Sequence, residues 1–197
     1  MAVPVYSASY KPSRDSYPKG SILAGGTEIR LVDESFDGGV GIGTNKKISG
    51  RPVDPSSVPT AISWPANRKP QDFESLFFRT VSERFRLLIE EIEPRVHQFL
   101  PLRYVKRTGE LIEKRWFWQI CNRVDSVFTD RPGWELDRGV WRYPQDDQYV
   151  FGIKKSSLCH FWHEKHILTG ILMSEFAMAR LNEEDISGFN MTAYATV

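Results

Sequence analysis

The stretch FRTVSERFRLLIEEIEPRVHQFLPLRYVKRTGELIEKRWFWQICN, residues 78–122, decides the fold of this chain. Its first half carries apolar residues at the spacing that places one apolar stripe along a helix: Phe85, Leu88, Ile89 and Ile92. Ser82 can accept a hydrogen bond from the free N–H groups of the first turn, and Pro94 ends the helix. The sequence therefore predicts a capped helix between these two residues.

The second half of this stretch predicts two antiparallel strands. The apolar period changes to two over residues 97–105, which favours an extended segment. Thr108-Gly109 is typical of a tight turn, and residues 111–121 predict a returning strand. A helix packed against an antiparallel pair forms the nucleus of a fold, and it does not by itself define a function.

Strands and a second helix follow on the C-terminal side. Strands are predicted at four places: residues 124–128, 134–143 (as a short pair), 149–153 and 167–173. Ser174 opens a second helix that ends near residue 184. These elements predict an α+β fold with a mainly antiparallel sheet and two principal helices packed on one face.

The N-terminal region is irregular and rich in proline. Residues 1–20 carry Tyr, Ser and Pro without a period, which indicates an extended arm or an edge strand. Five prolines between residues 49 and 70 indicate a long ordered loop, with Trp64 as an anchor. We therefore expect an arm with short strands over residues 1–50, packed on a main α+β domain over residues 51–197.

Composition places the chain among globular proteins without a strong bias in charge. Of its 197 residues, 41% are hydrophobic and 13% are aromatic, which is too many for a disordered chain. The formal net charge of +1 excludes a bulk attraction to nucleic acid or to an anionic membrane. We expect neither a secretory leader nor a membrane helix, because residues 1–20 show no apolar core region and no run of about 18 apolar residues occurs. Cys121 and Cys159 are expected to be reduced thiols. We expect a cytoplasmic protein.

A histidine cluster is the strongest candidate for metal binding. Three imidazoles and a carboxylate lie within seven residues: His160, His163, Glu164 and His166. The HExxH spacing is absent and no remote fourth ligand stands out, so a polar, partly exposed turn before a strand is the better interpretation. We assign no metal ligand, no cofactor and no catalytic residue. A metal-dependent hydrolase built on His160, His163 and His166 is kept as an alternative.

Two further patterns have both a structural and a functional interpretation. Cys121 and His97 lie on adjacent predicted strands and could form a nucleophile–base pair, but a core thiol beside a buried histidine is favoured. The strand that contains Trp116, Phe117 and Trp118 must turn one face into the core. An aromatic surface for a protein partner and a module that binds single-stranded nucleic acid are the alternatives.

A glycine run at residues 38–43, followed by Lys46 and Lys47, invites comparison with a phosphate-binding loop. The spacing GxxxxGKS or GxxxxGKT and the helix that follows it are both missing, because a proline-rich loop comes next. A flexible turn is therefore the expectation for this segment.

From residue 81 onward, the order of these signals resembles the bacterial MXAN-type immunity-protein family, which was first catalogued as a domain of unknown function. The resemblance covers roughly residues 50–190 and rests on a helix cap, the start of one strand and a later strand: Ser82, His97, Gln98, Phe99, Pro101, Asn122, Val124 and Asp125. It implies a cytoplasmic protein that protects a bacterium from a polymorphic toxin encoded beside it. The implied mechanism is stoichiometric binding of the toxin without catalysis, with no cofactor and no nucleic-acid or membrane partner.

The surface that contacts the toxin is expected on exposed loops with aromatic side chains. Loops often carry function, and aromatic residues anchor many interfaces. The residues expected there come from the arm, the long loop and the predicted strand pair: Tyr10, Tyr17, Trp64, Trp134 and Trp141.

Overall fold

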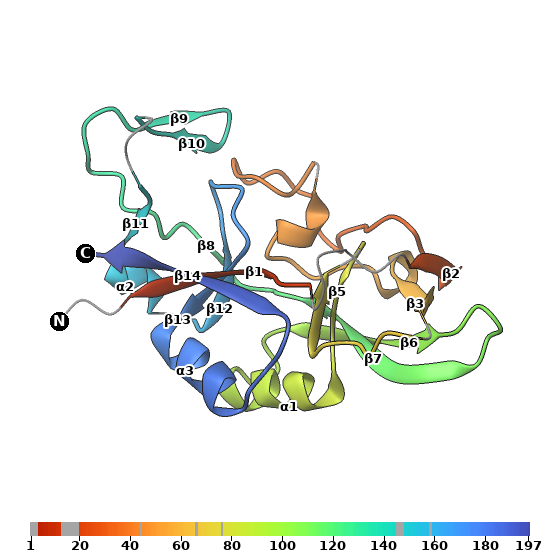
Figure 1. Ribbon diagram of the computed structural model, residues 1–197. Coiled ribbons are helices and arrows are strands. Elements are labelled where there is room, and N and C mark those ends of the chain that lie inside the picture. The colour runs from red at the N-terminus through yellow and green to blue at the C-terminus, as the bar shows by residue number, and fades with distance from the viewer. Residues whose placement is uncertain are drawn as a thin grey trace.

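The computed structural model describes residues 4–12, 20–43, 45–65, 67–75, 77–144, 148–157 and 159–197. Within these residues the chain forms two six-stranded sheets and a separate two-stranded hairpin (Figure 1). The first sheet contains, in spatial order, β11 (Val150–Phe151), β14 (Phe189–Thr196), β1 (Val5–Tyr10), β13 (Ile171–Ser174), β12 (Phe161–Glu164) and β8 (Arg123–Val124). The second contains β2 (Ser21–Gly25), β3 (Pro59–Ser63), β6 (Gln98–Val105), β7 (Leu111–Gln119), β5 (Arg79–Val81) and β4 (Phe73–Ser75).

The pairing of these strands is mixed. Most neighbours run antiparallel, whereas β3–β6, β8–β12 and β11–β14 run parallel. The hairpin of β9 (Glu135–Asp137) and β10 (Val140–Arg142) was predicted from the sequence and is confirmed. Together with the helices, these sheets give an α+β architecture.

The helix and the strand pair predicted from residues 78–122 are both confirmed, and the strand pair forms part of the second sheet. The helix α1 (Glu83–Ile92) begins at Ser82, whose hydroxyl accepts a hydrogen bond from the N–H of Phe85 at 3.2 Å. Strands β6 and β7 pair antiparallel along their lengths. Gly109 in the turn between them has a φ of +88°, a backbone conformation that glycine adopts without strain.

Strand β1 is a central strand, so the expectation of an arm or edge strand at the N-terminus is wrong. It lies between β13 and β14 and pairs antiparallel with both (Figure 1). Val5 and Ala8 are both buried, on opposite faces of the sheet. The sequence did not show this because the two partner strands come from the last part of the chain, far from residues 5–10.

The C-terminal helix is confirmed, whereas the strand before it is shorter than predicted. The helix α3 (Glu175–Glu183) begins at Ser174, whose hydroxyl accepts from the N–H of Ala177 at 3.1 Å. The chain turns between β12 and β13 because the carboxylate of Glu164 accepts the N–H groups of His166 and Ile167. For this reason the strand predicted over residues 167–173 is shorter in the structure and begins only at Ile171, the first residue of β13.

Two other predicted strands are also shorter in the structure. The segment 124–128 contributes little more than the end of β8, and the segment 149–153 contributes β11. The short helix α2 (Ile153–Ser156) follows β11 directly. The closing segment of the chain, for which the sequence analysis predicts no strand, forms the long strand β14.

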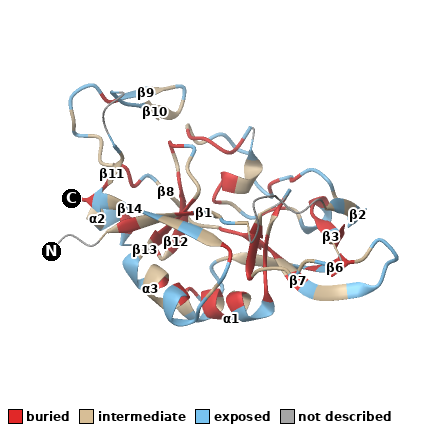
Figure 2. Ribbon diagram, in the orientation of Figure 1, coloured by how far each residue is buried: buried red, intermediate tan, exposed pale blue. Residues whose placement is uncertain are grey.

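Helices α1 and α3 lie side by side and pack where the two sheets meet (Figures 1 and 2). The buried face of α1 contributes Phe85 and Ile89, and that of α3 contributes Leu181, to a core shared with Trp118 of one sheet and Phe161 of the other. Burying such side chains stabilises a fold by about 1.5–3 kcal/mol each. The two sheets therefore share a single apolar core beneath the helices.

The segment between β2 and β3 packs on the second sheet. It contains the short 3-10 helices η1 (Lys46–Ile48) and η2 (Pro55–Ser57), and its apolar residues join a cluster with Leu102 and Phe117: Ile29, Leu31, Ile42, Val53 and Val58. The division of the chain at residue 50 stays a prediction.

Among the described residues, none of the helices is long and apolar enough to cross a membrane.

Candidate functional site

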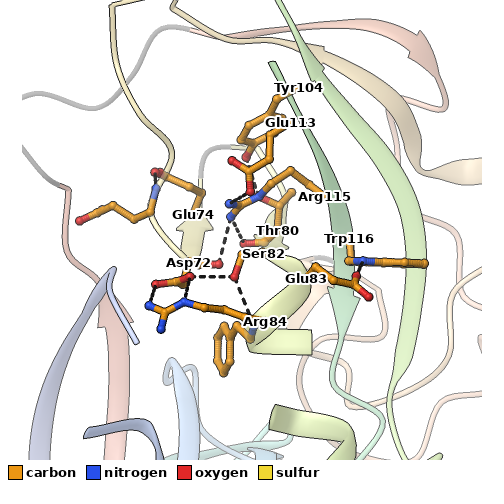
Figure 3. Close-up of polar contacts among 12 residues, drawn as sticks. Asp72, Glu74, Thr80, Ser82, Glu83, Arg84, Tyr104, Glu113, Arg115 and Trp116 are labelled. Carbon is orange, nitrogen blue, oxygen red and sulfur yellow. Dashed lines mark hydrogen bonds and ion pairs between the residues drawn. The ribbon is translucent and has the colours of Figure 1, made fainter. Parts of the chain in front are cut away.

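A dense polar cluster surrounds the carboxylate of Asp72 (Figure 3). Arg84 on α1 donates to it from Nε at 2.8 Å and from Nη2 at 2.6 Å, and the hydroxyl of Ser82 donates at 2.8 Å. From near the end of the chain, the N–H and the hydroxyl of Ser187 donate at 3.0 and 2.7 Å. Burial alone would raise the pKa of Asp72, but these hydrogen bonds, that of Arg84 foremost, hold the pKa below its usual value.

A second buried cluster surrounds Arg115 on β7 (Figure 3). Its Nη2 donates to the carbonyls of Asp72 at 3.0 Å and Thr80 at 3.3 Å, and its Nη1 donates to Glu113 at 3.1 Å. Its guanidinium also lies 5.2 Å from the ring centroid of Tyr104. Because the charged groups of both clusters are engaged by other parts of the chain, these clusters hold the fold together and do not form an open reactive site.

The three histidines considered for a metal site point to different partners. His160 hydrogen-bonds the hydroxyl of Ser174 at 2.7 Å, and Nδ1 of His166 hydrogen-bonds the carbonyl of Gly139 at 3.1 Å. Nε2 of His163 lies 2.5 Å from a guanidinium nitrogen of Arg79. Within the described residues, no group of three or more His, Cys, Asp or Glu side chains is placed to hold a metal ion.

The pair of Cys121 and His97 is arranged as a structural contact. The backbone N–H of Cys121 donates to Nδ1 of His97 at 3.2 Å, and Nε2 of His97 lies 2.7 Å from the carboxylate of Glu93. The histidine therefore contacts the backbone of Cys121 and not its thiol. Burial raises the pKa of the Cys121 thiol to about 11, so the thiol is not activated as a nucleophile near neutral pH.

Strand β7, which contains Trp116, Phe117 and Trp118, is covered on both faces. The expectation that it turns a face into the core is confirmed. Trp118 and Phe117 are buried on opposite faces of β7. Trp116 is half-buried, donates a hydrogen bond to Glu83 and lies 4.7 Å from the guanidinium of Arg86. With Trp118 fully buried, the two tryptophans do not form a platform on which bases could stack.

The aromatic residues expected to contact a partner are less exposed than the sequence suggested. Trp64 is 2% exposed and stacks on Tyr104 with ring centroids 4.6 Å apart. Trp134 is 9% exposed, and its ring packs with those of neighbouring tyrosines. Tyr10 and Trp141 are half-buried. Tyr17 lies outside the described residues.

The structure also brings together two cations that the sequence analysis did not connect. Nη1 of Arg79, on β5, donates to the backbone carbonyl of Lys47 at 3.0 Å. The ammonium of Lys47 lies 5.4 Å from the ring centroid of Phe78. Lys47 follows the glycine run and Arg79 begins the strand before α1, so their proximity depends on the tertiary fold and no local pattern indicates it.

Comparison with known protein families identifies the chain. Residues 42–196 match the family described as "Immunity protein family (Imm11)". Because this match covers well over half of the chain, the protein belongs to the Imm11 immunity protein family. The resemblance to an immunity-protein family that was noted in the sequence is thereby confirmed. No curated protein shows a significant match to the chain.

Proposed function

We propose that this protein neutralises a cognate bacterial toxin by binding it stoichiometrically, without catalysis. Membership of an immunity protein family over residues 42–196 is the observation that carries the proposal. The candidate catalytic groups support it, because the imidazole of His97 contacts a backbone amide and the thiol of Cys121 has a raised pKa. We further propose that the protein acts in the cytoplasm and that its toxin is encoded nearby.

The surface that binds the toxin includes, in this proposal, the half-buried Trp141 on the β9–β10 hairpin. Its ring packs against His166 with centroids 5.9 Å apart, and the backbone N–H of Trp141 donates to the backbone carbonyl of His166 at 2.9 Å. These contacts fix the hairpin on the loop between β12 and β13, which limits the entropy that would be lost on binding. Trp64 and Trp134 would act from beneath the surface by supporting it, and Tyr17 stays an expected contact.

Co-expression with the toxin tests the proposed function. The gene next to the one that encodes this protein is expressed in a host alone and together with the immunity protein, and growth is measured. We expect growth to be arrested by the toxin alone and restored by co-expression, and we expect the two proteins to co-purify at a ratio of one to one. Rescue without a complex would contradict stoichiometric binding and would indicate that this protein acts catalytically on the toxin or on its product.

A further inference from the structure

A hollow of about 440 Å³ lies beside the edge strand β2. Its apolar wall includes Ile22 of that strand and the exposed residue Phe77, whose relative exposure is 47%. Lys46 and Lys47, which follow the glycine run, form its basic wall. The hollow therefore combines apolar surface with positive charge at an accessible edge of the molecule.

Two cations, Lys47 in the wall of the hollow and Arg79 behind Lys47, are not neutralised by carboxylates of the described residues. Within the described residues, neither Lys47 nor Arg79 forms an ion pair with Asp or Glu, although both are half-buried. Burial, and secondarily the nearby Arg79, lower the pKa of Lys47, and burial lowers the pKa of Arg79 to about 10. A charge that is removed from water without a partner destabilises a protein, so such a pair calls for an explanation.

The histidine beside Arg79 does not supply the missing negative charge. Nδ1 of His163 lies 3.2 Å from the carbonyl of Gly170, so it carries the proton and donates, and Nε2 accepts from Arg79. Burial and the charge of Arg79 keep the pKa of His163 well below its usual value, so the ring is neutral. The positive charge of Arg79 is therefore retained behind Lys47.

The charges around the hollow favour an anion with a single charge. Lys46 is paired with Glu34, whereas Glu28 is an exposed carboxylate at the rim. Among the residues that line the hollow, Lys46, Lys47 and Glu28 together carry one net positive charge. A single carboxylate flanked by apolar groups matches this charge and the apolar wall, whereas a phosphate dianion would be repelled by Glu28.

We infer that this hollow receives an Asp or Glu side chain from the toxin, with the ammonium of Lys47 as its ionic partner and the exposed ring of Phe77 as its apolar contact. This inference rests on the proposed function and adds the chemistry of one contact. The partner surface that fits the hollow is a loop with a carboxylate next to apolar side chains.

Substitution of Lys47 tests the inference in the purified complex. We expect Lys47→Met to raise the Kd for the cognate toxin at least tenfold, mainly through faster dissociation, because the toxin carboxylate would lose its partner on binding. Lys47→Arg keeps the charge and should change the Kd much less. The free protein should melt at the same or a higher temperature with Met at this position, because an unpaired half-buried charge is removed. Isothermal titration and thermal melting measure these quantities.

Lys154→Met is the matched control. Lys154 is exposed on α2, which lies at the other end of the molecule from β2 in Figure 1, so its substitution should leave the Kd unchanged. If the wild-type protein does not bind the toxin, the proposed function fails. If the wild-type protein binds and Lys47→Met binds equally well, the inference alone is wrong.

Titration with inorganic phosphate separates a toxin carboxylate from a free anion. We expect no saturable binding of phosphate to the free protein at millimolar concentration. Phosphate binding that disappears in Lys47→Met, together with an unchanged Kd for the toxin, would overturn the inference and assign the hollow to a small anion.

Discussion

At the scale of single residues, Asp72 connects parts of the chain that are distant in sequence. Ser82 and Arg84 approach its carboxylate from the start of α1, and Ser187 approaches it from the turn before β14. Arg84 also donates to the carbonyls of Glu184 at 2.8 Å and Asp185 at 2.9 Å. The start of α1 is thus held against the end of α3 through one carboxylate and one guanidinium.

The substitution Asp72→Asn should destabilise the protein by about 2 kcal/mol, because an amide nitrogen would face donors that now meet a carboxylate oxygen. The loss stays moderate because the side chain of Arg84 is 53% exposed and solvent screens its charge. Urea unfolding measures the difference. Asp125→Asn is the control, since its ion pair with Lys155 spans 3.6 Å between exposed groups, and it should cost less than about 0.5 kcal/mol. Equal losses for the two variants would contradict the role given to Asp72.

The same carboxylate should make the stability depend on pH. The pKa of Asp72 in the folded protein lies below that of an unfolded chain, about 3.9. The stabilisation that ionised Asp72 provides is therefore fully present above the pKa of the unfolded chain. It is lost as the pH falls from there toward the pKa of the folded protein. We expect the gap in free energy of unfolding between the wild type and Asp72→Asn to shrink from about pH 6 to about pH 3. A gap that stays constant in urea unfolding at both pH values would show that the carboxylate charge is not the cause.

The sequence indicates the local contacts of such residues and not the distant ones. The cap at Ser82 was predictable because its acceptor role depends on a residue three positions away. The contact between Asp72 and Ser187 joins residues separated by 115 positions, and that between Lys47 and Arg79 joins residues separated by 32. For that reason the half-buried cations Lys47 and Arg79 could not be recognised as a pair before the fold was known.

At the scale of elements, the same distinction separates the helices from β1. Both main helices were predicted because a serine cap and an apolar spacing are local features. Strand β1 has a side-chain pattern too short to identify a central strand, and its neighbours lie near the other end of the chain. Its position is set by long-range backbone pairing, which local propensity does not encode.

Tyr10 ties β1 of the first sheet to β4 of the second. Its hydroxyl donates to the carboxylate of Glu74, which also accepts from the N–H of Gln71 at 2.8 Å. Burial raises the pKa of Glu74, so the carboxylate needs its hydrogen bonds when it is ionised. The contact therefore links the two sheets through a buried polar group.

The substitution Tyr10→Phe should lower the stability by about 1–2 kcal/mol, because one donor to a buried carboxylate is lost while the ring is kept. Tyr6→Phe is the matched control on the same strand, since no side-chain hydrogen bond of Tyr6 is found among the described residues. Chemical unfolding of both variants provides the measurement. If Tyr6→Phe costs as much as Tyr10→Phe, the contact with Glu74 does not contribute.

At the scale of the whole molecule, the region that matches the family is shorter than the region that forms the fold. The match begins at residue 42, whereas the first sheet contains β1 from residues 5–10. Strand β1 separates β13 from β14, so without it those two strands have no common neighbour. The matched region alone is therefore expected to be an incomplete folding unit.

Removal of residues 1–20 should accordingly abolish cooperative folding. The deletion takes away both ladders of β1 and the buried side chains of Val5 and Ala8, and it exposes apolar faces of the first sheet. The loss should exceed the stability of a typical domain, about 5–15 kcal/mol, so the truncated protein should show no cooperative thermal transition and no protection of β13 amides from hydrogen exchange. Removal of residues 1–3, which precede the strand, is the control and should keep the transition. A truncated protein that melts cooperatively and still binds the toxin would show that β1 is dispensable for folding and binding.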